Sequence, residues 1–323
     1  MGSRFSRKTC PRRYRTAVNI TELSIQSDGV TLVGTKVTPD DPKAIVLLVH
    51  GSGQLDRNQN SPTARLDTFS YLASALADAG FASVRWDKRG VGASGGDYQA
   101  LRQAQLVADV RAWIKLAEPA GPIYLLGHSE GTAIATEAAQ GQDIAGLILL
   151  CPYITPGGEI LIRQASHADA AIDALTGFRG WLARRISGFL GRPSQIQARI
   201  VQKLKNTKTA TIRVGLRKIP ALWLRDFVNA DLGSIHRSNQ RPSLIMVAEH
   251  DAQCPPEDGA KIAALNPTAE LVTVTGLSHI LRPAENKDLA DYPRQLALPN
   301  DPRVGEIVTN WLNQQTRGQE YMT

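Results

Sequence analysis

The sequence predicts an α/β fold with a mostly parallel central sheet, helices on both faces of that sheet and a helical insertion. Apolar runs typical of buried strands alternate with segments of helical periodicity, which is the pattern of parallel α/β sheets. A chain of 323 residues with 42% hydrophobic residues can bury one large core. No apolar run approaches the roughly 18–20 residues of a membrane span, and the basic start of the chain lacks the apolar stretch of a signal peptide. We therefore expect a cytoplasmic protein.

The order of these segments predicts four regions. We expect a basic, disordered tail at 1–18, a first part of the core at 19–152, an inserted cap or lid at 153–242 and a second part of the core at 243–323. Strands are predicted at 31–37, 45–49, 81–86, 121–126, 243–249 and 270–275, and helices at 66–79, 100–117 and 303–313. The first six residues also fit an N-myristoylation pattern, for which Cys10 and the basic run would be second signals.

A G-x-S-x-G pattern at 127–131 contains the strongest candidate for a catalytic residue. An apolar strand precedes Ser129 and small helix-forming residues follow it, so a strand, a tight turn and a helix would meet at this serine. Glycines flank the serine because a Cβ at either position would collide with the neighbouring strand or helix. The N-terminus of the helix would also favour negative charge that develops near the hydroxyl. Ser129 is therefore predicted to be a nucleophile.

A nucleophilic serine needs a histidine base and a carboxylate that orients the base. Asp251 and His279 each follow one of the last two predicted strands, and the carboxyl ends of parallel strands are where α/β sheets build their sites. The five other histidines lie in turns, in the serine motif, beside the acid or in the basic middle segment. Glu249 and Asp258 are rival acids, but one belongs to a strand and the other to a helix start. The order Ser, Asp, His predicts the triad Ser129, Asp251 and His279.

The third component of such a site is an oxyanion hole made of backbone N–H groups. The N–H of Glu130, directly after the nucleophile, is one predicted donor. A glycine-rich turn at 50–54 follows an early apolar strand, and it would supply the second donor. Ser52 is the predicted residue there, and Gln54 is close enough in sequence to compete.

Three phrases of the sequence carry a family resemblance. They are His50-Gly51-Ser52-Gly53 followed by Asp56-Arg57-Asn58, then Asp87-Lys88-Arg89-Gly90-Val91-Gly92-Ala93-Ser94, and Gly127-His128-Ser129-Glu130-Gly131. Through them, over roughly 20–150 and 240–315, the chain resembles bacterial esterase-like serine hydrolases of the α/β-hydrolase superfamily. The sequence departs from these relatives at Thr132, where they usually have a further glycine, and this narrows the space behind the serine. The resemblance implies an α/β-hydrolase fold with a cap.

The resemblance also implies hydrolysis of small or medium acyl esters through an acyl-enzyme intermediate, without a cofactor or metal. Acyl-CoA thioester hydrolysis and small-peptide hydrolysis use the same groups and stay open as alternatives. A non-enzymatic binding protein on a hydrolase scaffold is disfavoured, because all three triad residue types are present. The expected partner is a small acyl ester or thioester, and the sequence does not set the oligomeric state.

The predicted cap is strongly basic. Between 153 and 242 there are fifteen Lys/Arg and five Asp/Glu, a local charge of +10 in a chain of net charge +7. Apolar residues recur there at helical spacing, so the segment is predicted to form amphipathic helices over the serine. The favoured interpretation is that these charges lie on a solvated helix face. The second is that they attract acidic substrates, such as coenzyme A phosphates, or anionic lipid surfaces. Nucleic acid is the least favoured partner, because no aromatic stacking platform accompanies the charge.

Cysteine spacing and two further side chains complete the sequence predictions. Three widely separated cysteines without a C-x-x-C pattern indicate a reduced compartment and neither a disulfide framework nor a zinc site. Asp87 is predicted to cap its own turn rather than to act in catalysis. The side chain of Glu130 is predicted to form an ion pair with Arg57 from the neighbouring loop.

Overall fold

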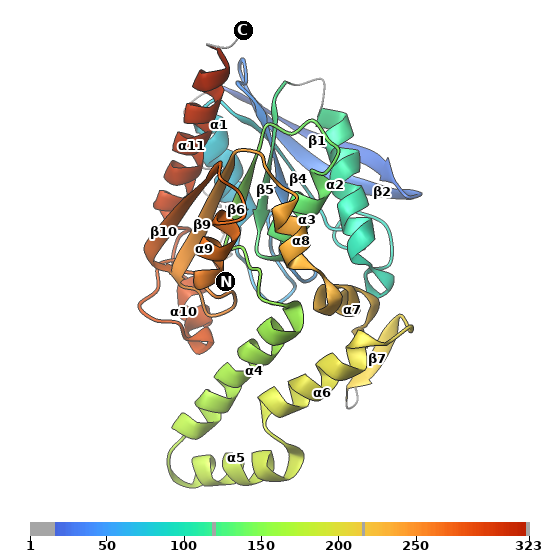
Figure 1. Ribbon diagram of the computed structural model, residues 1–323, viewed down its shortest axis with the longest axis vertical. Coiled ribbons are helices and arrows are strands. Elements are labelled where there is room, and N and C mark those ends of the chain that lie inside the picture. Colours follow the sequence, from blue (N-terminus) through green and yellow to red (C-terminus); the bar gives the residue numbers. More distant parts are fainter. Residues whose placement is uncertain (1–16, 118–120, 215–216, 321–323) are drawn as a thin grey trace, which may run out of the picture.

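The computed structural model of the protein describes residues 17–117, 121–214 and 217–320 (Figure 1). The lipidation pattern and nearly all of the predicted basic tail therefore lie outside the described residues. The first strand begins at Val18, the last residue of that predicted tail.

An eight-stranded sheet lies at the centre of the molecule. Its strands are β1 (Val18–Ser27), β2 (Val30–Pro39), β3 (Ile45–Val49), β4 (Ala82–Trp86), β5 (Ile123–His128), β6 (Gly146–Leu150), β9 (Ser243–His250) and β10 (Ala269–Ser278). They lie in the order β1-β2-β4-β3-β5-β6-β9-β10. β2 pairs antiparallel with both β1 and β4, and all other neighbouring strands pair in parallel. The predicted mostly parallel sheet is thus confirmed.

Two of these strands were not predicted from the sequence. β1 lies at the edge of the sheet and is largely exposed, so it has no apolar run that would mark it as a strand. β6 is apolar and fully buried, but it has only five residues. β3 has the same length and burial, but a glycine-rich motif follows β3 and marks it as a strand, whereas no such motif follows β6.

Helices cover both faces of the sheet, as predicted. One face carries α1 (Thr68–Asp78) and α11 (Pro302–Glu320), and the other carries α2 (Gln103–Ala117), α3 (Glu130–Ala138) and α9 (Glu257–Ala263). Trp113 and Ile134 pack on one side of the sheet, and Leu72 and Trp311 pack on the other. Short elements complete the core: η1 (Tyr98–Ala100), η3 (Leu289–Asp291) and α10 (Tyr292–Leu296).

A helical insertion separates β6 from β9, which are neighbours in the sheet. It contains α4 (Gly157–Ala174), α5 (Gly177–Leu190), α6 (Pro193–Lys205), β7 (Thr211–Val214), β8 (Arg217–Pro220), α7 (Leu222–Asn229) and α8 (Leu232–Arg237). α4 and α6 lie side by side and extend away from the sheet, and α5 joins their far ends (Figure 1). The β7–β8 hairpin was not predicted. We use "cap" for α4 to α7, because α8 packs beside α3 on the core.

The cap has a small core of its own at its base. Ile160, Val201, Leu204 and Phe227 are buried together there. The first turn of α4 also packs closely against α7. Only a glycine fits at position 157, since a Cβ there would lie 2.4 Å from the carbonyl oxygen of Phe227. The two ends of the cap are therefore in contact with each other where the cap meets the core.

Candidate active site

Ser129 lies between β5 and α3, at the carboxyl edge of the sheet. Its backbone has a positive φ of 56° with ψ −124°, a conformation that non-glycine residues rarely adopt. The main-chain oxygen of Ser129 accepts hydrogen bonds from the N–H of Thr132 at 2.9 Å and from its hydroxyl at 2.7 Å. Thr132, the residue that departs from the family pattern, therefore holds this strained turn through its side chain.

The glycines that flank the serine are required by close packing. A Cβ on Gly127 would lie 2.3 Å from the carbonyl oxygen of Gly131, and one on Gly131 would lie 2.2 Å from the carbonyl oxygen of Val49. Such contacts are far inside van der Waals distance, so the backbone would have to move. The predicted reason for both glycines is thus confirmed.

Asp251 and His279 are in direct contact, as the sequence predicts. His279 Nδ1 lies 2.7 Å from Asp251 Oδ2, and both side chains are buried. The other carboxylate oxygen accepts the N–H groups of Gln253 and Cys254, each at 2.8 Å. These partners fix the Asp251 carboxylate, which accepts a hydrogen bond from Nδ1 and leaves Nε2 of His279 as the nitrogen that can act as a base.

The two rival acids have other partners. Glu249 Oε2 accepts the N–H of Gly276 at 2.8 Å, which fixes a bulge in β10 just before His279. Asp258 accepts the N–H groups of Ile154 and Thr155 and the ammonium of Lys261. Of the three candidate acids, Asp251 alone contacts His279 in the described contacts.

The side chain of Ser129 lies next to the Asp251–His279 pair. It lies close enough to the Cys254 thiol to affect the pKa of that thiol, and the ligand atoms of Cys254, Asp251 and His279 lie within 4.8 Å of one another. The described hydrogen bonds do not include one from Ser129 Oγ to His279 Nε2. Hydrogen bonds of this kind commonly tighten only when substrate binds. Burial raises the pKa of the Cys254 thiol well above its usual value, so that thiol is protonated and is not a competing nucleophile.

His128 supports His279 from behind, a role that the sequence did not reveal. Its Nε2 donates to the main-chain oxygen of His279 at 2.8 Å, and its Nδ1 accepts from Gln59 Nε2 at 2.6 Å. Burial lowers the pKa of His128 to about 3, which keeps the ring neutral in this tautomer. Two groups of potential metal ligands lie here. One contains His128, Cys151 and His279, and the other contains Asp251, Cys254 and His279. Both nitrogens of His128 and Nδ1 of His279 are already used in hydrogen bonds, so these clusters fit a proton-transfer site better than a metal site.

The early glycine turn lies directly against Ser129. A Cβ on Gly51 would lie 3.2 Å from the carbonyl oxygen of His128 and 3.3 Å from Ser129 Cβ. Lys88 Nζ donates to the carbonyl oxygen of Gly51 at 2.6 Å, and this lysine is only 2% exposed. The peptide unit whose carbonyl Lys88 holds is the one that carries the N–H of Ser52. The sequence did not reveal this buried lysine, because its motif was interpreted as a turn.

The predicted ion pair between Glu130 and Arg57 is wrong. Glu130 is buried and accepts a hydrogen bond from Trp223 Nε1 on α7 of the cap. Burial raises the pKa of Glu130, and the charge of Lys88 and the bond from Trp223 act against that rise. The side chain that follows Ser129 thus connects the core to the cap instead of to the Arg57 loop.

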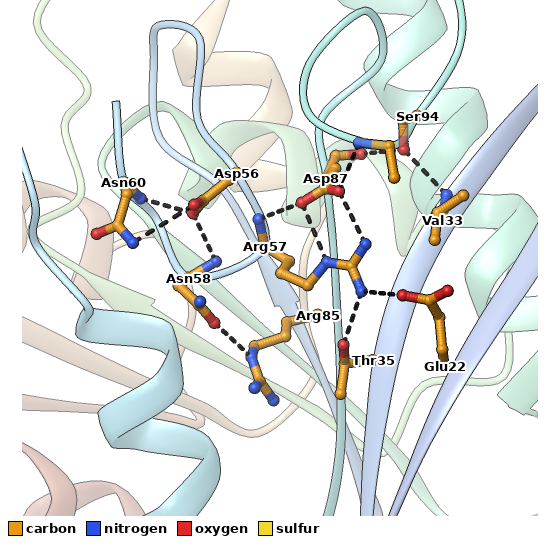
Figure 2. A network of polar contacts seen from close by, with 11 residues as sticks. Glu22, Val33, Thr35, Asp56, Arg57, Asn58, Asn60, Arg85, Asp87 and Ser94 are labelled. Atoms are coloured by element: carbon orange, nitrogen blue, oxygen red, sulfur yellow. Dashed lines mark hydrogen bonds and ion pairs between the residues drawn. The ribbon is translucent and has the colours of Figure 1, made fainter. Parts of the chain in front are cut away.

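Arg57 instead binds Asp87, and together they join the loops after β3 and β4 (Figure 2). Arg57 donates to both carboxylate oxygens of Asp87, at 3.1 and 2.9 Å, and donates also to Glu22 and Thr35. Burial alone would raise the pKa of Asp87, but the bonds from Arg57 and from the N–H of Ala93 hold it below its usual value. Asp87 is therefore structural, as predicted, but it binds a distant arginine and the N–H six residues on instead of capping its own turn locally.

A cavity of about 690 Å³ lies away from these residues. It is bordered by α1 and by the loop before α11, with Tyr71, Arg282 and Asn300 in its wall, and no residue of the predicted triad lines it. This cavity therefore does not coincide with the predicted site around Ser129.

Comparisons with known proteins identify the family and the fold. The family described as "Serine aminopeptidase, S33" matches residues 40–282. The esterase EstD of Thermotoga maritima is 21% identical over 280 residues, which are 84% of this chain. The chain spans 62% of the length of that curated relative.

Solved esterase structures have the same fold. Est1E of Butyrivibrio proteoclasticus, with ferulic acid bound, aligns with a TM-score of 0.59 and 18% identity over 91% of this chain and 98% of its own. An esterase of Pyrococcus furiosus aligns with a TM-score of 0.58 and 15% identity over 92% of this chain and 91% of its own. The predicted α/β-hydrolase fold is confirmed.

Proposed function

The chain belongs to the serine aminopeptidase (S33) family of hydrolases, and we propose that it is a serine esterase which cleaves small or medium carboxylic esters. The observation that supports this most strongly is the buried Asp251–His279 pair at 2.7 Å beside a strained serine turn. This arrangement gives the serine a base and gives the base an orienting carboxylate. The neighbouring thiols are protonated and the nearby His128 is neutral and fully hydrogen-bonded, so they do not compete for these roles.

In the first half-reaction Ser129 Oγ attacks the acyl carbonyl carbon while His279 Nε2 takes the hydroxyl proton. The carbonyl oxygen becomes an oxyanion, and Asp251 stabilises the imidazolium that forms. The tetrahedral intermediate then collapses, and His279 returns the proton to the leaving alcohol. In the second half-reaction a water molecule attacks the acyl-enzyme with the same proton transfers, which release the carboxylic acid and restore Ser129.

We assign the oxyanion hole to two backbone donors. Glu130 begins α3, and the first N–H groups of a helix have no acceptor within the helix. Ser52 follows Gly51, which lies against Ser129 Cβ and whose carbonyl Lys88 holds. Donors fixed in this way stabilise the oxyanion without reorganisation during the reaction.

Peptide hydrolysis is the second candidate function, because the family is named for aminopeptidases. Thioester hydrolysis is a further variant of the same chemistry, and the basic cap would attract the phosphates of acyl-CoA. The ferulic acid bound to Est1E is a carboxylic acid, the half that an ester releases on hydrolysis, so aromatic acyl esters belong among the substrates to be tested.

A substrate panel would decide among these candidates. The panel should contain p-nitrophenyl esters of graded acyl length, methyl ferulate, acyl-CoA thioesters and amino-acid p-nitroanilides, each with the wild type and Ser129→Ala. We expect ester turnover that Ser129→Ala abolishes. Higher kcat/KM for p-nitroanilides than for every ester would replace the esterase assignment with the peptidase one. Ester turnover that survives in Ser129→Ala would remove the proposed mechanism altogether.

A further inference from the structure

Helix α5 at the far end of the cap exposes an unusual amount of apolar surface. Phe178 is 73% exposed and Phe189 is 90% exposed. Of the eleven large hydrophobic residues exposed in the described chain, six belong to this helix: Phe178, Trp181, Leu182, Ile186, Phe189 and Leu190. A concentration of this kind marks an interaction site, whereas scattered exposed hydrophobics need no explanation.

The apolar residues occupy one side of α5. Positions 178, 182, 186 and 189 repeat at helical spacing, so they form a single stripe. The opposite side holds the helix in place: Gly180 is buried against the main chain of Leu175, and Arg184 donates to the carbonyl oxygen of Leu175 at 2.9 Å. Figure 1 shows α5 at the end of the cap, away from the sheet. The apolar stripe therefore has no described covering from the rest of the chain.

The sequence of α5 and of the segment after it is strongly basic. From 174 to 225 the sequence contains twelve Lys/Arg and no Asp/Glu. Arg185 lies over the Trp181 ring at 5.5 Å, and Arg179 is exposed. Neither arginine forms an ion pair among the described contacts. Aromatic side chains beside unpaired arginines are typical of helices that lie in the headgroup region of a bilayer.

We propose that α5 docks the protein on the surface of an anionic lipid bilayer. The apolar stripe would enter the boundary between headgroups and acyl chains, and the arginines would contact lipid phosphates. α5 has 14 residues, about 21 Å of helix, and no described helix is long and apolar enough to cross a membrane. The helix therefore lies along the surface. A second copy of the chain is a poor occupant, because pairing two such caps would bring like charges together.

This proposal is independent of the assigned chemistry, because it is tested by binding alone. The test is co-sedimentation of the purified full chain with large vesicles of phosphatidylcholine, with and without about 30% phosphatidylglycerol, at low and high salt. We expect binding to the anionic vesicles, weakened by salt, and at least tenfold weaker binding to the neutral ones. A blue shift of tryptophan fluorescence should accompany binding, and Trp181→Phe should remove most of that shift.

Two variants with matched controls separate the apolar and the charged contributions. Phe178→Ser with Phe189→Ser should weaken binding at least tenfold, whereas Ile20→Ser with Leu116→Ser, at exposed positions on the core, should not. Arg179→Gln with Arg185→Gln should weaken binding similarly, and Lys115→Gln with Lys287→Gln should not. Circular dichroism and an unchanged Tm would show that each variant is folded.

Three results would overturn the proposal. The first is the absence of binding to anionic vesicles. The second is binding that the Phe178/Phe189 variant retains in full, because charge alone would then explain it. The third is a dimer in sedimentation equilibrium that the same variant dissociates, which would assign the stripe to a second copy of the chain.

Discussion

At the carboxyl edge of the sheet, Asp251, His128 and His279 are buried and hydrogen-bonded to residues of the same chain. On α5, Phe178 and Phe189 are exposed and lie on the same helix as Arg179 and Arg185, which form no ion pair among the described contacts. The contacts within the chain explain the first region. The second region has no such contacts, and the lipid surface proposed to cover it lies outside the chain. Substitutions in the two regions should therefore differ in kind: the first should change chemistry, and the second should change where and on what the protein acts.

The largest effect should come from the triad, which tests whether the buried edge works as one unit. Ser129→Ala, His279→Ala and the double variant should each lose on the order of 10⁴-fold or more in kcat, because neither residue acts without the other. Ester turnover under saturating substrate measures this. If the two single losses multiplied in the double variant, one of the two assignments would be wrong.

The next effect distinguishes the three acids. Asp251→Asn should reduce kcat by about 10³–10⁴-fold, because an amide at this position disturbs the tautomer of His279. Glu249→Gln and Asp258→Asn are the matched controls, and their effects should be much smaller, since their partners lie elsewhere. A larger loss in either control would show that Asp251 is not the orienting acid.

Lys88 tests the support of the oxyanion loop. Lys88→Met should lower kcat by roughly 10–100-fold with little change in KM, because the peptide that carries the Ser52 N–H loses its anchor at the Gly51 carbonyl. Lys88→Arg keeps a donor and should recover part of the loss. An increase in KM at unchanged kcat would instead indicate that Lys88 serves substrate binding.

Acid should weaken the core through its buried histidines. Burial lowers the pKa of His50 and His128 to about 3 and of His236 to about 4. In the unfolded chain these pKa values return to about 6.5, so below pH 6.5 the unfolded state binds more protons and the free energy of unfolding falls. We expect Tm to drop by several degrees between about pH 7.5 and 5, and to drop less steeply in His236→Gln. A Tm that is flat over this range would contradict the prediction.

The smallest effect concerns the charge of the cap at some distance from α5. Lys203→Gln with Lys205→Gln should reduce kcat/KM a few-fold for acyl-CoA thioesters at low salt, and should leave neutral short esters unchanged. High salt should reproduce the loss in the wild type. If both substrate classes responded alike, the charge of α6 would be a solvated face, and the thioesterase alternative would lose its main support.

The sequence predicted those parts of the site that depend on local order. The serine turn, the two late strands and their terminal residues follow from short patterns, and the structure places Asp251 and His279 in contact. The contacts that were missed join residues far apart in the chain. Lys88 and Gly51 are 37 residues apart, and Trp223 and Glu130 are 93 apart.

No local pattern carries that information, because these contacts exist only after the strands have been ordered in the sheet. The same reason explains the error about Glu130 and Arg57. Both residues were expected near the predicted nucleophile and have opposite charges. Arg57 instead forms its ion pair with Asp87 on the adjacent loop. Opposite charge and proximity in a motif were not enough to predict the pair.

The contact between Gly157 and Phe227 has a consequence for how such proteins diversify. Because the cap begins and ends at one point, the chain between these residues forms a closed excursion, and the cost of closing it rises only slowly with its length. Helices can be lengthened, exchanged or deleted there without shifting a single strand register. Evolution or protein engineering could therefore replace the cap with another insertion. The sheet beneath would keep the predicted triad, and the range of substrates would change.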